Sequence, residues 1–420
     1  MLVITANWAL TDGSLWQPSA ARHVRWLGDV HRAALRGGFG RDGIYRPIDA
    51  IDIIFAGDTF DFLASRRWTG AVKPWHGGPL ISTTRAAVML TAARRSRHLF
   101  AALGRWTRHG LAVPAADRRG RPQPHLTRRA DVRVTLLTGD RDHWLDEAAP
   151  TAHRRGHTIG RTWATPDLVV HHGAEFDPLW TTGTPEGEAA FRADERHPLL
   201  GESLAVDLVA RFAADVLDQV PARPALRALL AILGTSHLAD LPAVLARWLA
   251  PAPGQRSPLA DAHETVRSAW NRSLAAWHRD TSRCPPACGL EASPVDALAA
   301  WLEPGAAPSP RITATVAALE PRLGRRVSGS MTVLGHIAPP AAHGDADSAP
   351  VICLGGLPAR TVARGRHDPS AWEPLETEPA SAAVIGLGAA AAGRSGDTVV
   401  DAIIHPAITS VSTDAVGHAA

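Results

Sequence analysis

Two apolar stretches that end in Gly-Asp decide the fold: AIDIIFAGDTFD at residues 50–61 and VRVTLLTGDRDHW at residues 132–144. Each begins as a run of β-forming apolar residues, so each predicts a buried strand that ends just before Asp58 or Asp140. In open α/β sheets, ligands bind at the carboxyl ends of the strands. We therefore expect both carboxylates to lie at the ligand-binding edge of a sheet.

Two further stretches share this shape but end in histidine. DLVVHHGAEFDP at residues 167–178 predicts a strand before His172, and MTVLGHIAPP at residues 331–340 predicts a strand before His336. Two carboxylates and two imidazoles form a mixed set of oxygen and nitrogen ligands that suits Mn, Fe, Co or Zn. The sequence thus predicts one divalent metal ion whose ligands are Asp58, Asp140, His172 and His336.

In their order along the chain, these motifs resemble those of the calcineurin-like metallophosphoesterases. That family carries D-x-H, G-D-x-x-D, G-N-[HR]-D, H-G and G-H-x-H, each after a strand. Here residues 57–61 match the second motif, residues 139–142 the third, residues 172–173 the fourth, and residues 335–336 half of the fifth. Arg141 and the turn HGAEFDP resemble the branch that includes the UDP-2,3-diacylglucosamine diphosphatases.

The first and last motifs depart from the family pattern. Residues 6–9 read Ala-Asn-Trp-Ala where the family has D-x-H, and Ala338 stands where the family has its last histidine. The resemblance implies two metal sites, and these losses remove the first site while leaving the ligands of the second. It therefore implies one metal ion per chain, although Asn7 or Asp12 could partly rebuild the first site.

The resemblance implies a metal-dependent phosphoesterase-like hydrolase that acts on a phosphomonoester, a phosphodiester or a pyrophosphate. The substrate would be a phosphate-containing small molecule or lipid precursor. Arg141 would neutralise the developing oxyanion charge, and Asp142 would orient Arg141. The alternative is a non-catalytic metallophosphoesterase-like binding module that acts through a helical insert. The lost ligands of the first site favour this alternative, whereas the four retained positions favour the enzyme.

Each of these residues also has an ordinary structural interpretation. A Gly-Asp after a strand often forms a turn or a helix N-cap, and His172 or His336 could be ordinary strand-end or core residues. Arg141 and Asp142 could pair with each other at the surface. For three further residues, a solvated turn position is the favoured interpretation: Asp61, Asp177 and His143.

The strands alternate with segments of helical periodicity at residues 19–36 and 85–110, and this βαβ rhythm predicts a layered α/β core. We expect a β-sandwich flanked by helices, as in the metallophosphoesterases, formed by residues 1–185 and 326–420. The Pro- and Arg-rich residues 114–128 are interpreted as a polar loop.

An inserted all-helical unit is predicted at residues 186–325. Three amphipathic segments with few strand formers support it, at residues 186–220, 224–249 and 258–280. Because both ends of the unit adjoin the metal-bearing sheet edge, it could form a lid or an apolar substrate wall. Its tryptophans are expected in the helix core, namely Trp248, Trp270, Trp277 and Trp301.

Composition excludes several other classes of protein. A chain of 420 residues with 45% hydrophobic content can bury one large core and a smaller module. The net charge of +3, with dispersed arginines, does not indicate nucleic-acid binding. Three cysteines form neither a disulfide framework nor a zinc pattern. The absence of an apolar run of about 18 residues predicts no membrane span, so we expect a cytoplasmic protein. The sequence indicates no oligomeric state.

Overall fold

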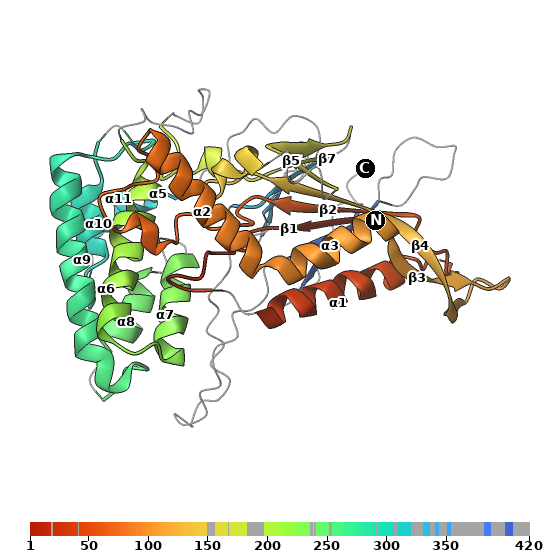
Figure 1. Ribbon diagram of the computed structural model, residues 1–420, viewed down its shortest axis with the longest axis horizontal. Coiled ribbons are helices and arrows are strands. Elements are labelled where there is room, and N and C mark those ends of the chain that lie inside the picture. The colour runs from red at the N-terminus through yellow and green to blue at the C-terminus, as the bar shows by residue number, and fades with distance from the viewer. Residues whose placement is uncertain are drawn as a thin grey trace.

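The computed structural model describes residues 1–17, 20–40, 42–148, 156–166, 168–182, 197–235, 238, 241–251, 254–290, 292–305, 307, 309–320, 331–336, 341–343, 351–353, 382–387 and 400–405. These residues form two β-sheets with helices beside them (Figure 1). Parallel strands occur in both sheets, and the predicted α/β class is confirmed.

The larger sheet has seven strands in the order β12-β11-β1-β2-β4-β3, and β5 also pairs with the long strand β4. Strands β1, β2, β4 and β5 run parallel, β3 and β11 join them antiparallel, and β12 pairs antiparallel with β11. The bounds are β1 Leu2–Thr5, β2 Ala50–Ala56, β3 Leu111–Ala116, β4 Pro122–Leu137, β5 His157–Gly160, β11 Ala382–Leu387 and β12 Val400–His405.

The smaller sheet has five strands in the order β6-β7-β8-β10-β9. The bounds are β6 Thr162–Ala164, β7 Leu168–His171, β8 Met331–Leu334, β9 Ala341–His343 and β10 Val351–Cys353. Leu168 and Val170 of this sheet share a buried cluster with side chains of the larger sheet, such as Ile4, Ile54 and Leu137. The two sheets therefore pack face to face, and the parallel strands β1 and β2 are apolar on both faces because both faces are covered.

Helices cover the opposite face of the larger sheet (Figure 1). Trp26 and Val30 of α1 and Leu103 of α3 pack in one buried cluster with Ile53 and Val134 of the sheet. The bounds are α1 Ala20–Arg36, α2 Pro79–Arg95 and α3 Arg97–His109, with 3₁₀-helices η1 Arg66–Trp68, η2 His143–Ala148 and η3 Ala174–Phe176. The helix predicted at residues 85–110 is thus two helices that meet at Ser96.

Further helices lie between β7 and β8 in the sequence and gather at one end of the molecule (Figure 1). Trp248, Trp270 and Trp277 are buried there, as predicted, and Trp301 packs against the same core. The bounds are α5 Leu200–Ser203, the π-helix η4 Leu204–Ala210, α6 Arg211–Gln219, α7 Pro224–Thr235, α8 Leu241–Leu249, the 3₁₀-helix η6 Ala260–Ala262, α9 His263–Arg283, α10 Val295–Trp301 and α11 Pro310–Ala317.

One prediction about these segments is corrected by the structure, and another remains a prediction. The helix predicted at residues 224–249 is two helices, α7 and α8, and Pro242 lies in the first turn of α8, where its missing N–H costs no helical hydrogen bond. The division into a core and a separate helical insert stays a prediction, because one continuous hydrophobic cluster includes side chains of both parts. Residues 186–196, at the start of the predicted insert, lie outside the described residues.

The polar loop predicted at residues 114–128 is wrong, because β3 and β4 form a β-hairpin there (Figure 1). Asp117 closes the turn, since its Oδ1 accepts the backbone N–H groups of Arg119 and Arg121 at 2.7 and 2.8 Å. Gly120 adopts the left-handed φ of +69° that this turn requires. Local turn chemistry therefore closes a hairpin whose tip, from Pro122 to Arg129, is polar and largely exposed.

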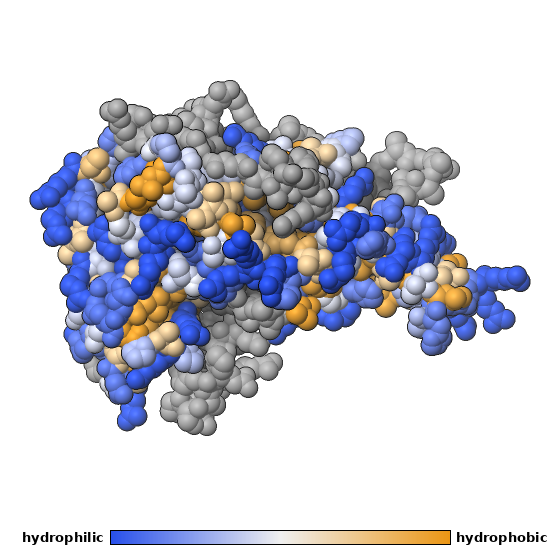
Figure 2. Space-filling model, in the orientation of Figure 1, coloured by the Kyte–Doolittle hydropathy of each residue, from blue (hydrophilic) through white to orange (hydrophobic). Residues whose placement is uncertain are grey.

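The outer surface is largely hydrophilic on the face shown in Figure 2, where hydrophobic residues form small groups. Among the described residues, no helix combines the length and the apolar character needed to cross a lipid bilayer.

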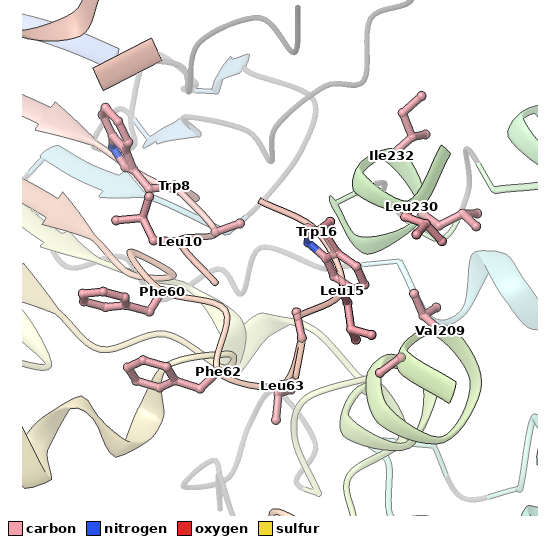
Figure 3. Packing of buried hydrophobic residues seen from close by; sticks show 14 of the residues in the cluster. Trp8, Leu10, Leu15, Trp16, Phe60, Phe62, Leu63, Val209, Leu230 and Ile232 are labelled. Carbon is pink, nitrogen blue, oxygen red and sulfur yellow. The ribbon is translucent and has the colours of Figure 1, made fainter. Parts of the chain in front are cut away.

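The segment that follows β1 joins the sheet to the helices. In Figure 3, Leu15 and Trp16 lie beside Leu230 and Ile232 of α7 and Val209 of the π-helix. A Cβ atom on Gly234 would come within 2.3 Å of the Trp16 ring, so the indole lies directly on the backbone of α7. The chain that leaves the first strand is therefore held by helical residues more than 190 positions later in the sequence.

We expect Trp16→Ala to lower the free energy of unfolding by about 3–5 kcal/mol, because it removes a large buried ring and leaves a cavity. Chemical denaturation measures this loss. Val24→Ala is the control, since Val24 is 72% exposed and its replacement should change stability by less than about 0.5 kcal/mol. A loss below about 1 kcal/mol for Trp16→Ala would contradict the packing of this segment on α7.

Candidate metal centre

The four predicted metal ligands converge at one point. Asp58 and Asp140 follow the parallel strands β2 and β4 of the larger sheet, and His172 and His336 follow the parallel strands β7 and β8 of the smaller sheet. One ligand atom from each lies within 4.8 Å of the others. The predicted convergence is confirmed, and the largely buried cluster that these residues form could hold a metal ion.

Glycines before three of these residues allow the close approach. A Cβ atom on Gly57 would lie 2.1 Å from His172 Nδ1, and one on Gly139 would lie 2.2 Å from Asp58 Oδ1. A Cβ atom on Gly335 would lie 1.9 Å from the carbonyl oxygen of Ala56. These separations are far below van der Waals contact, so the glycines of the sequence motifs are required by the packing of one strand end on another.

Backbone strain also concentrates here. Asp58 has a φ of +47°, and the neighbouring Asn7 and Ala9 have φ values of +54° and +48°. Non-glycine residues rarely adopt this left-handed region, and such strain typically occurs at functional sites. The backbone N–H of Ala9 donates to the carbonyl oxygen of Asp58 at 3.1 Å, and that of Arg141 donates to Asp58 Oδ1 at 3.0 Å. These bonds hold Asp58 in the strained conformation.

The hydrogen bond of His172 Nδ1 determines what its other nitrogen offers. Nδ1 lies 3.0 Å from the carbonyl oxygen of Ala56, which can only accept, so Nδ1 carries a proton. In the neutral ring, Nε2 then presents a lone pair to Asp140 Oδ1 at 2.6 Å and to Asp58 Oδ2 at 3.5 Å. Nε2 is therefore the atom of His172 that would bind a metal ion.

His336 has the same arrangement with its two nitrogens exchanged. Nε2 lies 2.6 Å from Asp177 Oδ2, and Nδ1 lies 3.1 Å from both His172 Nε2 and Asp140 Oδ1. When the Asp177 carboxylate accepts a proton from Nε2, Nδ1 is left with its lone pair directed into the cluster. Nδ1 is the atom of His336 that would bind a metal ion.

The donor set fits a divalent cation. The lone pairs of two imidazole nitrogens and of carboxylate oxygens face one another at about hydrogen-bond distance, so positive charge must lie among them. Oδ2 of Asp140 is buried and has no hydrogen-bond partner among the described residues, which leaves a carboxylate oxygen available to coordinate. We expect Mn, Fe, Co or Zn from this mixture of oxygen and nitrogen ligands.

The clustered charges shift the pKa values of these groups. Burial favours the neutral histidines, but the carboxylates of Asp58 and Asp140 outweigh it and raise the pKa of His172 well above 6.5. Burial also opposes charge on His336, yet Asp140 and Asp177 raise its pKa to about 10. For Asp140, the charge of His336 and the hydrogen bond from His172 overcome burial and hold the pKa well below 3.8. Protons thus supply the positive charge in the metal-free chain.

Arg141 lies beside the cluster, but Asp142 does not orient it. Arg141 Nη1 donates to Asp61 Oδ2 at 2.9 Å and to the carbonyl oxygen of Gly234 at 2.7 Å. Asp142 instead accepts the backbone N–H groups of Gly139 at 2.6 Å and Phe60 at 3.1 Å. Burial and the charge of Asp58 raise the pKa of Asp142 to about 8. The predicted contact between Arg141 and Asp142 is therefore wrong, and Asp61 has the orienting position.

Two of the three residues interpreted as solvated turn positions are buried around the centre. Asp61 and Asp177 are 1% and 2% exposed, so that interpretation is wrong for both. His143 is partly buried, and its Nδ1 lies 2.9 Å from the carbonyl oxygen of Asp140. The sequence signal for Asp61 and Asp177 was their place in the GDTFD and HGAEFDP motifs, since composition and periodicity do not distinguish them from turn residues.

The residues after β1, where the resemblance implies another metal site, make packing and hydrogen-bond contacts. Trp8 is fully buried, and its Nε1 donates to Thr5 Oγ1 at 2.8 Å. Asn7 donates from Nδ2 to the carbonyl oxygen of Gly335 at 2.6 Å. Asp12 accepts hydrogen bonds from Ser14 and Ser65. Asp12 therefore stabilises the loop in which it lies. Ala338 lies outside the described residues.

We expect Gly57→Ala to lower metal content and stability together, because the added methyl group displaces the His172 ring. Gly43→Ala is the matched control: Gly43 has a similar φ of +70°, but a Cβ atom there meets no atom within 4 Å. Both variants carry the same kind of backbone strain, so only Gly57→Ala should lose the metal. Elemental analysis and chemical denaturation measure the two effects. Equal metal content in both variants would contradict the packing of His172 on Gly57.

Metal affinity should rise with pH, because binding must displace the protons that His172 and His336 hold. Between pH 6 and 9, we expect the metal affinity to rise about tenfold per pH unit for each displaced proton. The stability of the metal-free chain should instead fall as the pH rises. The stabilisation that comes from the raised histidine pKa values is fully present below pH 6.5, and the part due to His336 is lost as the pH rises through about 10. Titration calorimetry in buffers of different ionisation enthalpy counts the released protons, and an affinity independent of pH would contradict this account.

The comparisons with known proteins identify no relative of this chain. No family model, no curated protein and no solved structure matches this chain. The assignment of the centre therefore depends on the geometry of its own residues.

Proposed function

We propose that this chain is a metal-dependent phosphoesterase-like hydrolase, acting on a phosphomonoester, a phosphodiester or a pyrophosphate. One divalent ion would be held by Asp58, Asp140, His172 and His336. The observation that carries the proposal is the convergence of these four side chains at the carboxyl ends of four strands from two sheets. The resemblance of the sequence motifs to the metallophosphoesterases supports the same reaction class.

A divalent ion in this centre would lower the pKa of a bound water and polarise a phosphoryl oxygen. The chain's own residues hold the centre in place: the carbonyl oxygen of Ala56 orients His172, and the backbone N–H of Arg141 orients Asp58. Asp142 connects the two Gly-Asp turns, because its carboxyl group accepts from Gly139 in one turn and from Phe60 in the other. We propose a positioning role for Asp142 on this basis.

Arg141 is the residue that would bind the substrate phosphate. Its Nη1 is anchored by Asp61 and Gly234, while its Nε and Nη2 hydrogen-bond no other residue in the described part of the chain. A guanidinium group held at one end and free at the other is preorganised to donate to phosphoryl oxygens. Asp61, which is fully buried, would position Arg141 rather than contact the substrate.

The same anchor supports a role for the helices in substrate binding. Gly234 belongs to α7, so the hydrogen bond from Arg141 brings the carboxyl end of this helix next to the centre. We propose that α7 borders the substrate, as a lid or an apolar wall. A phosphate-containing small molecule or a lipid precursor would suit a centre that has an arginine on one side and an apolar helix on the other.

A non-catalytic binding module is the second candidate. The observation that favours it is the replacement of the family's first metal site by packing residues, above all the fully buried Trp8. A single ion supplies less positive charge to a phosphoryl group than a pair does. Under this alternative the centre would retain a metal for structural reasons, without hydrolysis.

Turnover of a generic aryl phosphate by metal-loaded protein tests the proposal. We expect hydrolysis that requires one metal per chain, and His172→Ala should lose both the metal and the activity. Arg141→Ala should keep the metal and lower turnover by about 10²–10³, because it removes a preorganised donor. Arg66→Ala is the control, since Arg66 forms an exposed ion pair with Asp218.

Two results would contradict the proposed hydrolase. One is wild-type protein that binds a metal stoichiometrically but cleaves no phosphoester, which is what the binding module predicts. The other is activity that survives His172→Ala, which would place the reaction elsewhere on the chain.

A further inference from the structure

We propose that Asp177 is a positioning residue that selects which nitrogen of His336 faces the metal centre. The inference rests on the metal-binding part of the proposed function and does not depend on the reaction. The resemblance assigns no role to Asp177, although this residue lies in the HGAEFDP turn.

Asp177 is firmly held on the segment that also presents His172. The chain turns at Gly173, which has a φ of +98°, passes through η3 and reaches Asp177 with its side chain 2% exposed. Its Oδ1 accepts the backbone N–H of Leu179 at 2.8 Å. Its Oδ2 lies 2.6 Å from His336 Nε2. The two oxygens therefore have different partners, and both partners are donors.

His336 needs such a partner more than His172 does. Its side chain is 13% exposed, against 4% for that of His172, and it is the most exposed of the four candidate ligands. Its backbone N–H donates to the carbonyl oxygen of His172 at 2.7 Å, which fixes the main chain but leaves the ring free to rotate. Among the described residues, Asp177 is the hydrogen-bond partner at the outer edge of the ring.

The charge of Asp177 adds to its geometric effect. The outward nitrogen of His172 is bound by a neutral carbonyl oxygen, whereas that of His336 is bound by a carboxylate. A carboxylate on the outer N–H of a ligating histidine fixes its tautomer and makes the ring a stronger donor to the metal. Asp177 would thus strengthen a centre that has a single ion.

Asp177→Asn separates positioning from packing, because asparagine has nearly the same shape but only one oxygen. If that oxygen keeps the Leu179 N–H, the amide NH₂ group faces His336 Nε2 and donates to it. The ring proton then moves to Nδ1, which cannot bind a metal in that form. If Asp177 serves only packing, this variant should bind metal much like the wild type. If Asp177 positions His336, the variant should present the protonated nitrogen of His336 to the centre.

The experiment compares the Zn²⁺ and Mn²⁺ affinities of the full chain by competition with a chelator. We expect Asp177→Ala to weaken binding by about 10–100-fold, the usual effect of removing such a partner, and Asp177→Asn to weaken it further. Glu175→Gln is the matched control, because Glu175 lies two residues earlier and pairs with His171, which is not a member of the cluster. This control should bind metal like the wild type.

Metal affinity within about threefold of wild type in Asp177→Asn would overturn the proposal, as would an alanine variant that binds more weakly than the asparagine variant. An equal loss in Glu175→Gln would show that the segment as a whole is responsible, which also overturns it. If Asp177→Ala fails to fold, the nearly isosteric Asp177→Asn decides alone. Because affinity is measured without turnover, a wild type that binds metal but hydrolyses nothing would refute the proposed hydrolase and leave this inference standing.

Discussion

The structure depends on the close approach of two sheets at the carboxyl ends of their parallel strands. Gly57, Gly139 and Gly335 permit this approach, since any side chain at these positions would overlap a neighbouring atom. The approach brings carboxylates from one sheet against imidazoles from the other, all with lone pairs directed at one another. Such an arrangement is stable only if positive charge lies within it, supplied by protons in the metal-free chain and by a cation in the loaded one.

Around this centre, the outer contacts of the two histidines leave one nitrogen of each ring facing a cluster that could hold a cation. His172 donates outward to a carbonyl oxygen and His336 to a carboxylate, so both rings direct their free nitrogens inward. Asp58 and Asp142 are held by backbone N–H groups, which join the two Gly-Asp turns into one rigid unit. Asp58 keeps its left-handed backbone conformation because several hydrogen bonds hold it there. A site built only for packing would have no need of buried, mutually facing acceptors.

Much of this centre could be predicted because its residues occur in short local motifs. Glycine followed by Asp or His after an apolar run indicates a strand end with a polar side chain, and parallel strands place such ends at one edge. The orienting partners could not be predicted in the same way. Arg141 bonds to Asp61, not to its near neighbour Asp142, because the direction of each side chain follows from the fold of the turn rather than from distance in sequence. The β3–β4 hairpin escaped prediction because the first half of β4 is polar and exposed and the hairpin depends on Asp117 and Gly120 in the turn.

The sequence by itself determined the α/β class and the four side chains that meet, because apolar runs and glycines are local features with a fixed structural meaning. Tertiary structure alone decided which nitrogen of each histidine faces the centre, since that depends on Ala56 and Asp177, which lie 116 and 159 residues away from their partners. It also decided that Trp8 is a packing residue, and that Trp16 and Gly234 bring α7 beside Arg141. Such contacts form between distant parts of the chain, and their geometry arises only when the two sheets and the helices pack together.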